Sequence, residues 1–554
     1  MKKLLNYLWT LTFKKMSNEN YFYPKDINYK YESEKFISHI WYSVYYNAKL
    51  SVCTVFCVSV MSTYFSLSLS TYIGELSNTN DKEIIITSLL SIASVWVLIP
   101  ILRMVNFGFE LISTQNIRIG VTKYYSFHAL HSNIAIDNNF NVGKVVDRIE
   151  TIGESTTSFV HSLCDTIIKI CAIIVICVVN FSLIDIKLGV LTAIWLLFST
   201  SFSCYLAYTG INLIEQASDY HAKLISKLTE SLSSLNHVIR NSLQLKSIAR
   251  LDKYLKKDLK SCREVRSYWL LVQVIEGINK ILFGVSIGFV IFNLYLNNLI
   301  STQELVTAIS LLILLSFHYE SVAFNFVELF HSAGEVRSSL NYLNALKSID
   351  DNKSKSDIDY KRVELVLFNS EIFPLEPNDR IAIIGNSGSG KSTFFNNLLG
   401  LTNVSSVTVD GNPTNIRSCA SYLGSNPYLL EGSLEENLGS SLDNLLILNN
   451  ELFSLMATLG IKNNTSISED AKNISLGQRQ VLGLAREIIK GSKFLLLDEA
   501  FSNLDKNTKA LIHEKILPNY EGTIISIIHD TSLIKYYRKT IDFNDPIPLF
   551  KSVV

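Results

Sequence analysis

The sequence predicts two structural classes in one chain. An all-α membrane domain of six transmembrane helices with long cytoplasmic extensions is expected first, and an α/β domain is expected to follow it. Of the 554 residues, 48% are hydrophobic and only 18% are charged, whereas soluble globular chains carry about 25% charged residues. The long apolar runs precede residue 330, and a glycine-rich loop, "GNSGSGKST", follows at residues 385 to 393.

Residues 1–40 are predicted to form a cytoplasmic or interfacial segment. In "MKKLLNYLWTLTFKK" leucines alternate with polar residues, and lysines flank both ends. This pattern favours an amphipathic helix lying at the membrane surface. A frayed tail is the alternative.

Residues 41–341 are predicted to form the membrane domain. A helix needs about 20 mostly apolar residues to span a bilayer, and six runs meet this length. They lie at about 50–72, 83–105, 159–181, 188–209, 269–296 and 304–327. Short loops join the members of each successive pair. About 50 and about 60 residues, without proline, separate the pairs, so helices are expected to continue well beyond the bilayer.

The distribution of basic residues predicts the orientation. Eleven lysines and arginines lie between residues 210 and 266, and the three short loops carry almost none. Cytoplasmic loops are enriched in Lys and Arg. The long connections and both chain ends are therefore expected on the cytoplasmic side.

Four polar residues in the last two spans are candidates for a water-filled cargo cavity, because ionisable groups within spans are costly and usually functional. They are Glu276, Lys280, His318 and Glu320. Glu276 and Lys280 lie four residues apart, a spacing that allows them to pair along one helix face. The alternative is that all four are ordinary charges at the membrane boundary.

The glycine-rich loop lies between an apolar strand, "RIAIIG", and a helix beginning near "FFNNLLG". This arrangement with GxxxxGK[ST] is the pattern of a P-loop NTPase, in which backbone N–H groups and the helix N-terminus bind phosphate. Lys391 is predicted to reach the terminal phosphates, and Ser392 to bind Mg²⁺. The candidate ATP-binding residues of the loop are Gly385, Asn386, Ser387, Gly388, Ser389, Gly390, Lys391, Ser392 and Thr393.

A second apolar strand, "FLLLDE", supplies the carboxylates that such a loop requires. Asp498 is predicted to hold Mg²⁺ through water. Glu499 follows at the tip of the strand, where a carboxylate can polarise an attacking water. Both belong to the predicted nucleotide-binding domain, residues 361–554, which a charged linker at 342–360 joins to the membrane domain.

Three further motifs resemble those of ATP-binding cassette (ABC) proteins. "ISLGQRQVLGLARE", residues 474–487, is similar to the signature motif, "SNLD", 502–505, to the D-loop, and "IISIIHD" places His529 as the switch histidine. With six preceding spans, the order of motifs resembles an exporter-type half-transporter, possibly of the bacterial peptide or bacteriocin group. The resemblance implies ATP hydrolysis with Glu499 and His529 as catalytic residues, and Asp505 in the D-loop.

The resemblance also implies a dimer. In this family each ATP lies between the phosphate loop of one chain and the signature of the other, here Ser475, Leu476, Gly477 and Gln478. One chain carries one of each motif, so a homodimer with two composite sites is expected.

Two positions depart from the family pattern, and a third keeps it in part. Ser425 stands where the family usually has a glutamine that reaches the metal and the water, and it is too short to span the same distance. Leu476 replaces a glycine of the signature. Tyr360 has the spacing of the aromatic residue that stacks on adenine, although the strand before it is truncated, and a plain surface tyrosine is the alternative.

The function expected from this resemblance is export driven by ATP and Mg²⁺ from the cytoplasm or inner leaflet, by alternating access in the inner membrane of a bacterium. A small peptide is the preferred cargo, and a lipid or amphipathic drug is the alternative. A different class, an ATP-gated channel or regulator with weak coupling, also stays open because of Ser425. The 50 basic and 50 acidic residues balance, which gives no indication of a nucleic-acid partner.

Overall fold

The computed structural model describes residues 35–77, 82–130, 142–344, 363–366, 372–402, 406–409, 412–462, 464–544 and 549–552. Contacts divide the chain into two units, with the boundary between residues 347 and 348. The expected N-terminal helix, most of the linker and Tyr360 lie outside the described residues.

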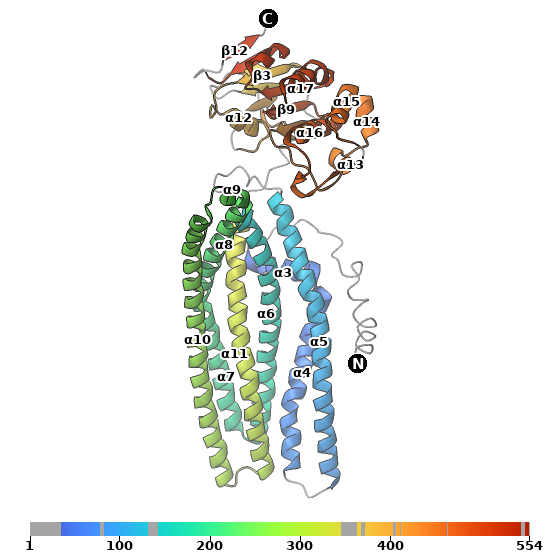
Figure 1. Ribbon diagram of the computed structural model, residues 1–554. Coiled ribbons are helices and arrows are strands. Elements are labelled where there is room, and N and C mark those ends of the chain that lie inside the picture. Colours follow the sequence, from blue (N-terminus) through green and yellow to red (C-terminus); the bar gives the residue numbers. More distant parts are fainter. Residues whose placement is uncertain are drawn as a thin grey trace. The chain divides into compact units, whose positions relative to one another are not determined.

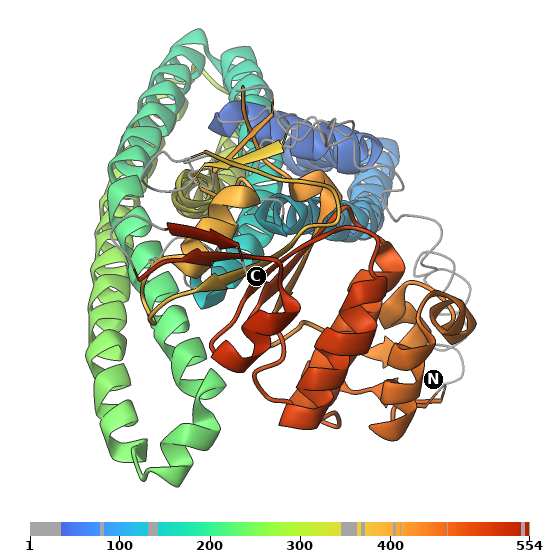
Figure 2. The same cartoon turned by 90° about the horizontal axis from the view of Figure 1, so that it is seen from above.

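The first unit is built from long helices that lie side by side (Figure 1). They are α3 (Phe36–Asn47), α4 (Lys49–Leu76), α5 (Lys82–Leu130), α6 (Val142–Ile184), α7 (Ile186–Thr209), α8 (Ile211–Ser233), α9 (Leu235–Arg240), α10 (Gln244–Leu296) and α11 (Thr302–Asn344). The short α9 joins α8 to α10, and these two long helices form the green hairpin at the left of Figure 2.

Five described helical stretches are long and apolar enough to cross a membrane. They are α4, α5, α10, the stretch Ile186–Ser233 that α7 and α8 form together, and the first part of α11, Thr302–Tyr319. The third expected span lies in α6, where the apolar stretch Ile170–Ile184 is shorter and the side chains of 165–169 are not described. The chain therefore has the helices of a multi-pass membrane protein, and the count of six stays a prediction.

The helices of this unit approach closely because small residues line their contacts. The buried face of α4 carries Ser51, Ser59, Thr63, Ser70 and Gly74. Three of these hydroxyls donate to backbone carbonyls three or four residues earlier in the chain, at 3.0 Å for Ser51, 2.9 Å for Thr63 and 2.8 Å for Ser70. The hydroxyls are thereby satisfied without a partner helix, which allows tight packing in an apolar surrounding.

The second unit contains two main sheets. The strands β1 (Val363–Val366), β2 (Ile372–Pro374), β4 (Val407–Val409) and β5 (Asn412–Thr414) pair antiparallel in the order β2-β1-β4-β5. The six-stranded sheet has the order β12-β11-β3-β10-β9-β6. Its members are β3 (Arg380–Ile384), β6 (Ala420–Gly424), β9 (Phe494–Asp498), β10 (Thr523–Ile527), β11 (Lys539–Asp542) and the antiparallel β12 (Leu549–Ser552).

Helices surround the larger sheet. They are α12 (Lys391–Leu398), α13 (Leu434–Leu438), α14 (Leu442–Leu448), α15 (Asn450–Thr458), α16 (Leu476–Lys490) and α17 (Lys506–Leu511). Phe394 and Phe395 of α12 are fully buried in a core that lies between the two sheets. The apolar face of α16 enters a second core with α13, α14 and α15.

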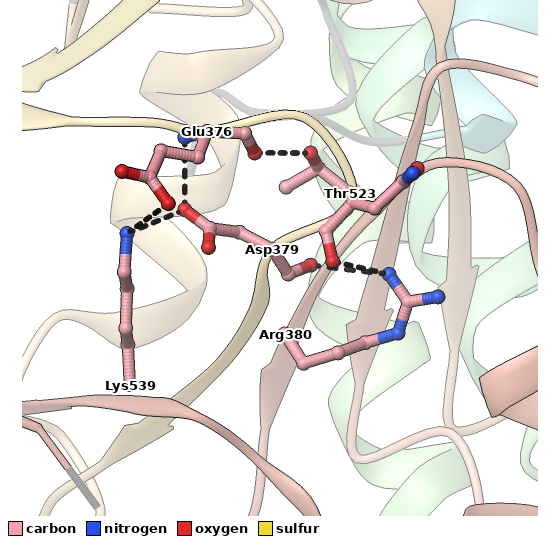
Figure 3. Close-up of polar contacts among 6 residues, drawn as sticks. Glu376, Asp379, Arg380, Thr523 and Lys539 are labelled. Atoms are coloured by element: carbon pink, nitrogen blue, oxygen red, sulfur yellow. Dashed lines mark hydrogen bonds and ion pairs between the residues drawn. The ribbon is translucent and has the colours of Figure 1, made fainter.

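A polar network holds the strand ends that lie opposite the glycine loop (Figure 3). The buried Asp379 carboxylate accepts from Lys539 Nζ at 2.7 Å and from the Glu376 N–H at 2.9 Å. The Arg380 guanidinium donates to the carbonyls of Gly522 and Tyr520. The network holds the N-terminal end of β3 between its parallel neighbours β10 and β11. It thereby helps to position the loop that follows β3.

Candidate active site

The carboxyl ends of four parallel strands meet at one edge of the six-stranded sheet. Ile383 pairs with Ile527, and Asp498 pairs with both Ile527 and Gly424. Residues that follow β3, β6, β9 and β10 are thereby brought together, and such edges are where open α/β sheets bind ligands.

The glycine loop between β3 and α12 needs backbone conformations that only glycine adopts freely. Gly388 and Gly390 have φ values of 83° and 94°, in the left-handed region. The Lys391 ammonium is buried and donates to the carbonyls of Gly385 and Asn386 at 2.9 and 2.8 Å. Lys391 therefore closes the loop on itself, with α12 beginning at the same residue.

Asp498 ends β9, and its carboxylate has one identified partner. The Tyr422 hydroxyl, on the neighbouring strand β6, donates to Asp498 Oδ2 at 3.0 Å. Among the described residues, none forms a hydrogen bond with the other oxygen, Oδ1. One carboxylate oxygen is therefore oriented by Tyr422, and the other is available to a ligand.

Glu499 and His529 form a direct pair at this edge. His529 Nε2 lies 2.6 Å from Glu499 Oε1, and both side chains are nearly half exposed. Glu499 has a φ of 50°, a strained conformation for a residue with a side chain, of the kind found at functional sites. A cavity of about 210 Å³ is lined by Glu499, Ser502 and His529.

Ser425 contributes to this region through a hydrogen bond of its backbone carbonyl. Its carbonyl accepts from Gln480 Nε2 at 2.7 Å. The fully buried Gln480 amide also bonds the Ser502 hydroxyl at 3.3 Å and accepts from the Asn503 N–H at 3.2 Å. One side chain thus joins the segment after β6, the helix α16 and the "SNLD" loop.

Ser475 caps α16 and forms a reciprocal capping box with Gln478. The Gln478 N–H donates to Ser475 Oγ at 3.2 Å, and the Ser475 N–H donates to Gln478 Oε1 at 2.8 Å. Leu476 is partly exposed in the first turn, and Gly477 packs beside Leu504. The N–H groups of this turn lie at the positive end of the helix dipole.

Asp505 caps α17 and accepts from the N–H groups of Asn507 and Thr508, each at 3.0 Å. Hydrogen bonds from Thr508, first from its side chain and then from its backbone, lower the pKa of Asp505. Its structural role in the described chain is therefore to hold the "SNLD" loop at the start of that helix.

The residues present fit a nucleotide with Mg²⁺. Ser389 Oγ, in the glycine loop, is buried and has no hydrogen-bond partner in the described chain. An orphaned buried hydroxyl is costly unless a ligand satisfies it. Together with the oxygen Oδ1 of Asp498 and exposed hydroxyls at Ser392 and Thr393, this donor set suits phosphate and a hard cation.

The four candidate cavity residues lie on two helices. Glu276 is buried on α10, near Ser203 of α7. His318 of α11 lies 2.9 Å from the Ser66 hydroxyl of α4. Glu276 and His318 therefore face different neighbouring helices. Lys280 has a partner as well, and the side chain of Glu320 is not among those described.

Sequence reasoning missed two residues of the site, Tyr422 and Gln480. Tyr422 carried one faint signal, a tyrosine in a short apolar strand, "ASYLG". The signal for Gln480 was a polar residue on the mostly apolar buried face of α16. Neither signal indicates a partner, because both partners come from segments distant in the chain.

Comparisons with known proteins show which proteins the chain is similar to. Residues 369–502 match the family described as ABC transporter. The chain is 26% identical over 446 residues to the lacticin-481/lactococcin-DR transport/processing ATP-binding protein of Lactococcus lactis subsp. lactis, covering 74% of this chain and 62% of that protein. It is 34% identical over 189 residues to the sublancin-168-processing and transport ATP-binding protein of Bacillus subtilis, covering 31% and 26%.

Among solved structures, a bacterial Atm1-family ABC exporter with ATP bound aligns with a TM-score of 0.76 at 16% identity. The alignment covers 89% of this chain and 93% of that one. The chain spans less than two thirds of the length of these curated relatives. Its fold is that of an exporter-type half-transporter: a helical membrane domain followed by an ABC ATPase domain.

Proposed function

We propose that this chain, an ABC ATPase domain on an exporter-type membrane fold, is an ATP-hydrolysing primary active exporter. It works as a homodimer in the inner membrane of a bacterium, with its ATPase domains in the cytoplasm. It moves a small peptide or an amphipathic molecule outward by alternating access.

One observation carries the proposal: the pair Glu499–His529 lies at the same sheet edge as the glycine loop and Asp498. The loop supplies phosphate contacts, Asp498 supplies a metal-binding oxygen, and Glu499 supplies a base held by a histidine. These are the parts that phosphoryl transfer to water requires, and they follow helices suited to a bilayer.

Each part has a role in hydrolysis. The Lys391 ammonium exchanges the carbonyls of Gly385 and Asn386 for the terminal phosphates of ATP. Glu499 accepts a hydrogen bond from the attacking water and orients it, while His529 holds the Glu499 carboxylate in place. Ser392 and Asp498 would hold Mg²⁺, which would neutralise part of the phosphate charge.

The second copy completes each site. The turn that begins with Ser475 presents its N–H groups at a helix N-terminus, where an anion binds well. Leu476 keeps its backbone N–H, so loss of the usual glycine does not remove a donor. Two composite sites form when the domains close on ATP, and they separate after hydrolysis.

Peptide cargo is supported by the relatives, whose names describe transport of lacticin, lactococcin and sublancin. We assign Glu276, Lys280, His318 and Glu320 to the cargo pathway. Because Glu276 is buried beside Ser203 within the span, it is suited to recognise a basic or hydrogen-bonding group of the cargo.

The test is a transport assay with the purified chain in liposomes. A panel of small peptides, lipids and amphipathic drugs is offered in the presence of ATP and Mg²⁺. We expect one class to stimulate ATP hydrolysis and to accumulate on the side away from the ATPase domain. Glu499→Gln should abolish both, with a loss of hydrolysis of about 100-fold or more, and should retain ATP binding. Cargo movement that survives Glu499→Gln would contradict the proposal.

A second function, an ATP-gated channel, is favoured by Ser425 alone. Its hydroxyl replaces a glutamine that in this family links the metal and water to the membrane domain, so coupling between hydrolysis and transport would be weaker. A channel would pass cargo in either direction when ATP binds, without hydrolysis. The same Glu499→Gln liposomes separate the two functions.

A further inference from the structure

Tyr422 lies directly beside the metal carboxylate, although the ABC motifs do not include it. The residue is in β6, whose neighbour β9 ends at Asp498. In the parallel register Tyr422 pairs with Leu496 and Gly424 pairs with Asp498. The Tyr422 ring therefore starts two residues behind Asp498 and extends along the strand direction, so that its hydroxyl donates to Asp498 Oδ2 at 3.0 Å.

Gly424 leaves room for this hydroxyl. A methyl group at residue 424 would lie 3.2 Å from the Tyr422 Oη and 3.3 Å from Cε1 of the same ring. Both distances are shorter than ordinary contacts. The absence of a side chain at 424 is thus part of the geometry that allows the Tyr422–Asp498 hydrogen bond.

The ring is held from the other side by the phosphate-loop helix. Phe395 of α12, fully buried, contacts the Tyr422 ring edge to face with centroids 6.4 Å apart.

The hydrogen bond leaves Asp498 with a defined orientation. With Oδ2 engaged by Tyr422, the oxygen Oδ1 is the one left to a metal ion or its water. Ser425, three residues after Tyr422, has a hydroxyl in place of the longer amide expected there, and its carbonyl is occupied by Gln480. Within residues 422–425, Tyr422 is therefore the side chain that orients the Asp498 carboxylate.

We propose that Tyr422 is a positioning residue that holds the Asp498 carboxylate for Mg²⁺ and takes over part of the role of the missing glutamine. The inference rests on the proposed ATP hydrolysis. It predicts that removal of the Tyr422 hydroxyl oxygen weakens the binding of Mg²⁺ and leaves the binding of the nucleotide itself unchanged.

The test measures metal binding separately from turnover. The full chain with Glu499→Gln, which does not hydrolyse, is titrated with Mg²⁺ in the presence of a fluorescent trinitrophenyl ATP. In the Tyr422→Phe background we expect the Mg²⁺ concentration at half-saturation to rise about three- to tenfold. Binding of the same nucleotide in EDTA should stay unchanged.

Two further variants control the measurement. Tyr428→Phe removes a hydroxyl from an exposed tyrosine on the same segment and should leave the Mg²⁺ dependence unchanged. Gly424→Ala keeps Tyr422 intact and displaces its hydroxyl, so it should shift the Mg²⁺ dependence in the same direction as Tyr422→Phe. The phenylalanine variant preserves the packing on Phe395, and Gly424→Ala probes the same bond if Tyr422→Phe is poorly folded.

An unchanged or tighter Mg²⁺ half-saturation in both Tyr422→Phe and Gly424→Ala would overturn the inference, and the proposed function would stand if the wild-type chain still hydrolyses ATP. If the Glu499→Gln chain binds no trinitrophenyl ATP and the wild type has no ATPase activity, the proposed function and the inference fall together.

Discussion

At the scale of single residues, His513 shows how burial sets a charge state. It follows α17 and is almost fully buried. The rings of Phe501 and Tyr536 pack against it, and the Tyr537 hydroxyl lies 3.3 Å from its Nδ1. Burial, and then the nearby Lys509 ammonium, lower the pKa of His513 from 6.5 to about 4. The folded chain therefore holds this imidazole neutral.

This shift predicts acid sensitivity. A histidine with a lowered folded pKa stabilises the fold fully above pH 6.5, and the contribution is lost as pH falls toward 4. The shift of the His513 pKa from 6.5 to about 4 corresponds to roughly 3 kcal/mol in the free energy of unfolding. We expect the melting temperature of the purified chain to fall more steeply from pH 7 to pH 4 in the wild type than in His513→Gln. His237→Gln, at an exposed site, should follow the wild type. Parallel curves for the wild type and His513→Gln would contradict this explanation.

At the scale of elements, the membrane unit depends on contacts that admit no side chain. Gly74 of α4 faces α11, and a methyl group there would lie 1.7 Å from the Thr307 hydroxyl and 3.2 Å from the Gln303 carbonyl. Because the second atom belongs to the backbone of α11, rotation of a side chain alone cannot relieve the clash. The approach of α4 to α11 therefore requires glycine at this position.

The matched comparison is with Gly284 of α10, where no atom lies within 4 Å of an added methyl group. Alanine is the better helix former, by about 1 kcal/mol. We therefore expect Gly284→Ala to be neutral or slightly stabilising, whereas Gly74→Ala should lower the melting temperature in detergent by overpacking, which costs about 1–3 kcal/mol. Thermal unfolding monitored by tryptophan fluorescence checks both. Equal melting temperatures for the two variants would show that α4 and α11 do not pack this closely.

At the scale of the whole molecule, the proposed composite sites mean that ATP hydrolysis requires two chains. The described part of each chain contains one glycine loop, with Lys391, and one signature turn, with Gly477. In a mixed dimer that combines Lys391→Ala in one chain with Gly477→Asp in the other, one site receives both defects. The other site receives none.

Complementation follows from this arrangement. Each homodimer of the two variants should be inactive, and the purified mixed dimer, isolated through two different tags, should regain part of the wild-type ATPase activity. The control is a mixed dimer in which one chain carries both substitutions and its partner neither, where each site receives one defect and no activity is expected. Recovery in that control, or none in the first mixture, would refute the shared sites.

The sequence by itself determined the parts whose signals are local. Apolar runs long enough for a bilayer, the loop "GNSGSGKST" between a strand and a helix, and the strand ending in Asp498 and Glu499 are each written in contiguous residues. Their physical basis is short-range: the length of a span, glycine at positive φ, and an apolar strand ending in a carboxylate. The resemblance to ABC exporters rested on the order of such segments.

Only the tertiary structure decided which groups meet. Tyr422 and Asp498 are 76 residues apart, and Gln480 joins Ser425 to Ser502 and Asn503 across three segments. It also placed Glu276 beside Ser203 and His318 beside Ser66, on different helix pairs. Such contacts follow from the order of strands in the sheet and from which helix faces pack together, and both depend on the whole chain rather than on any one stretch of it.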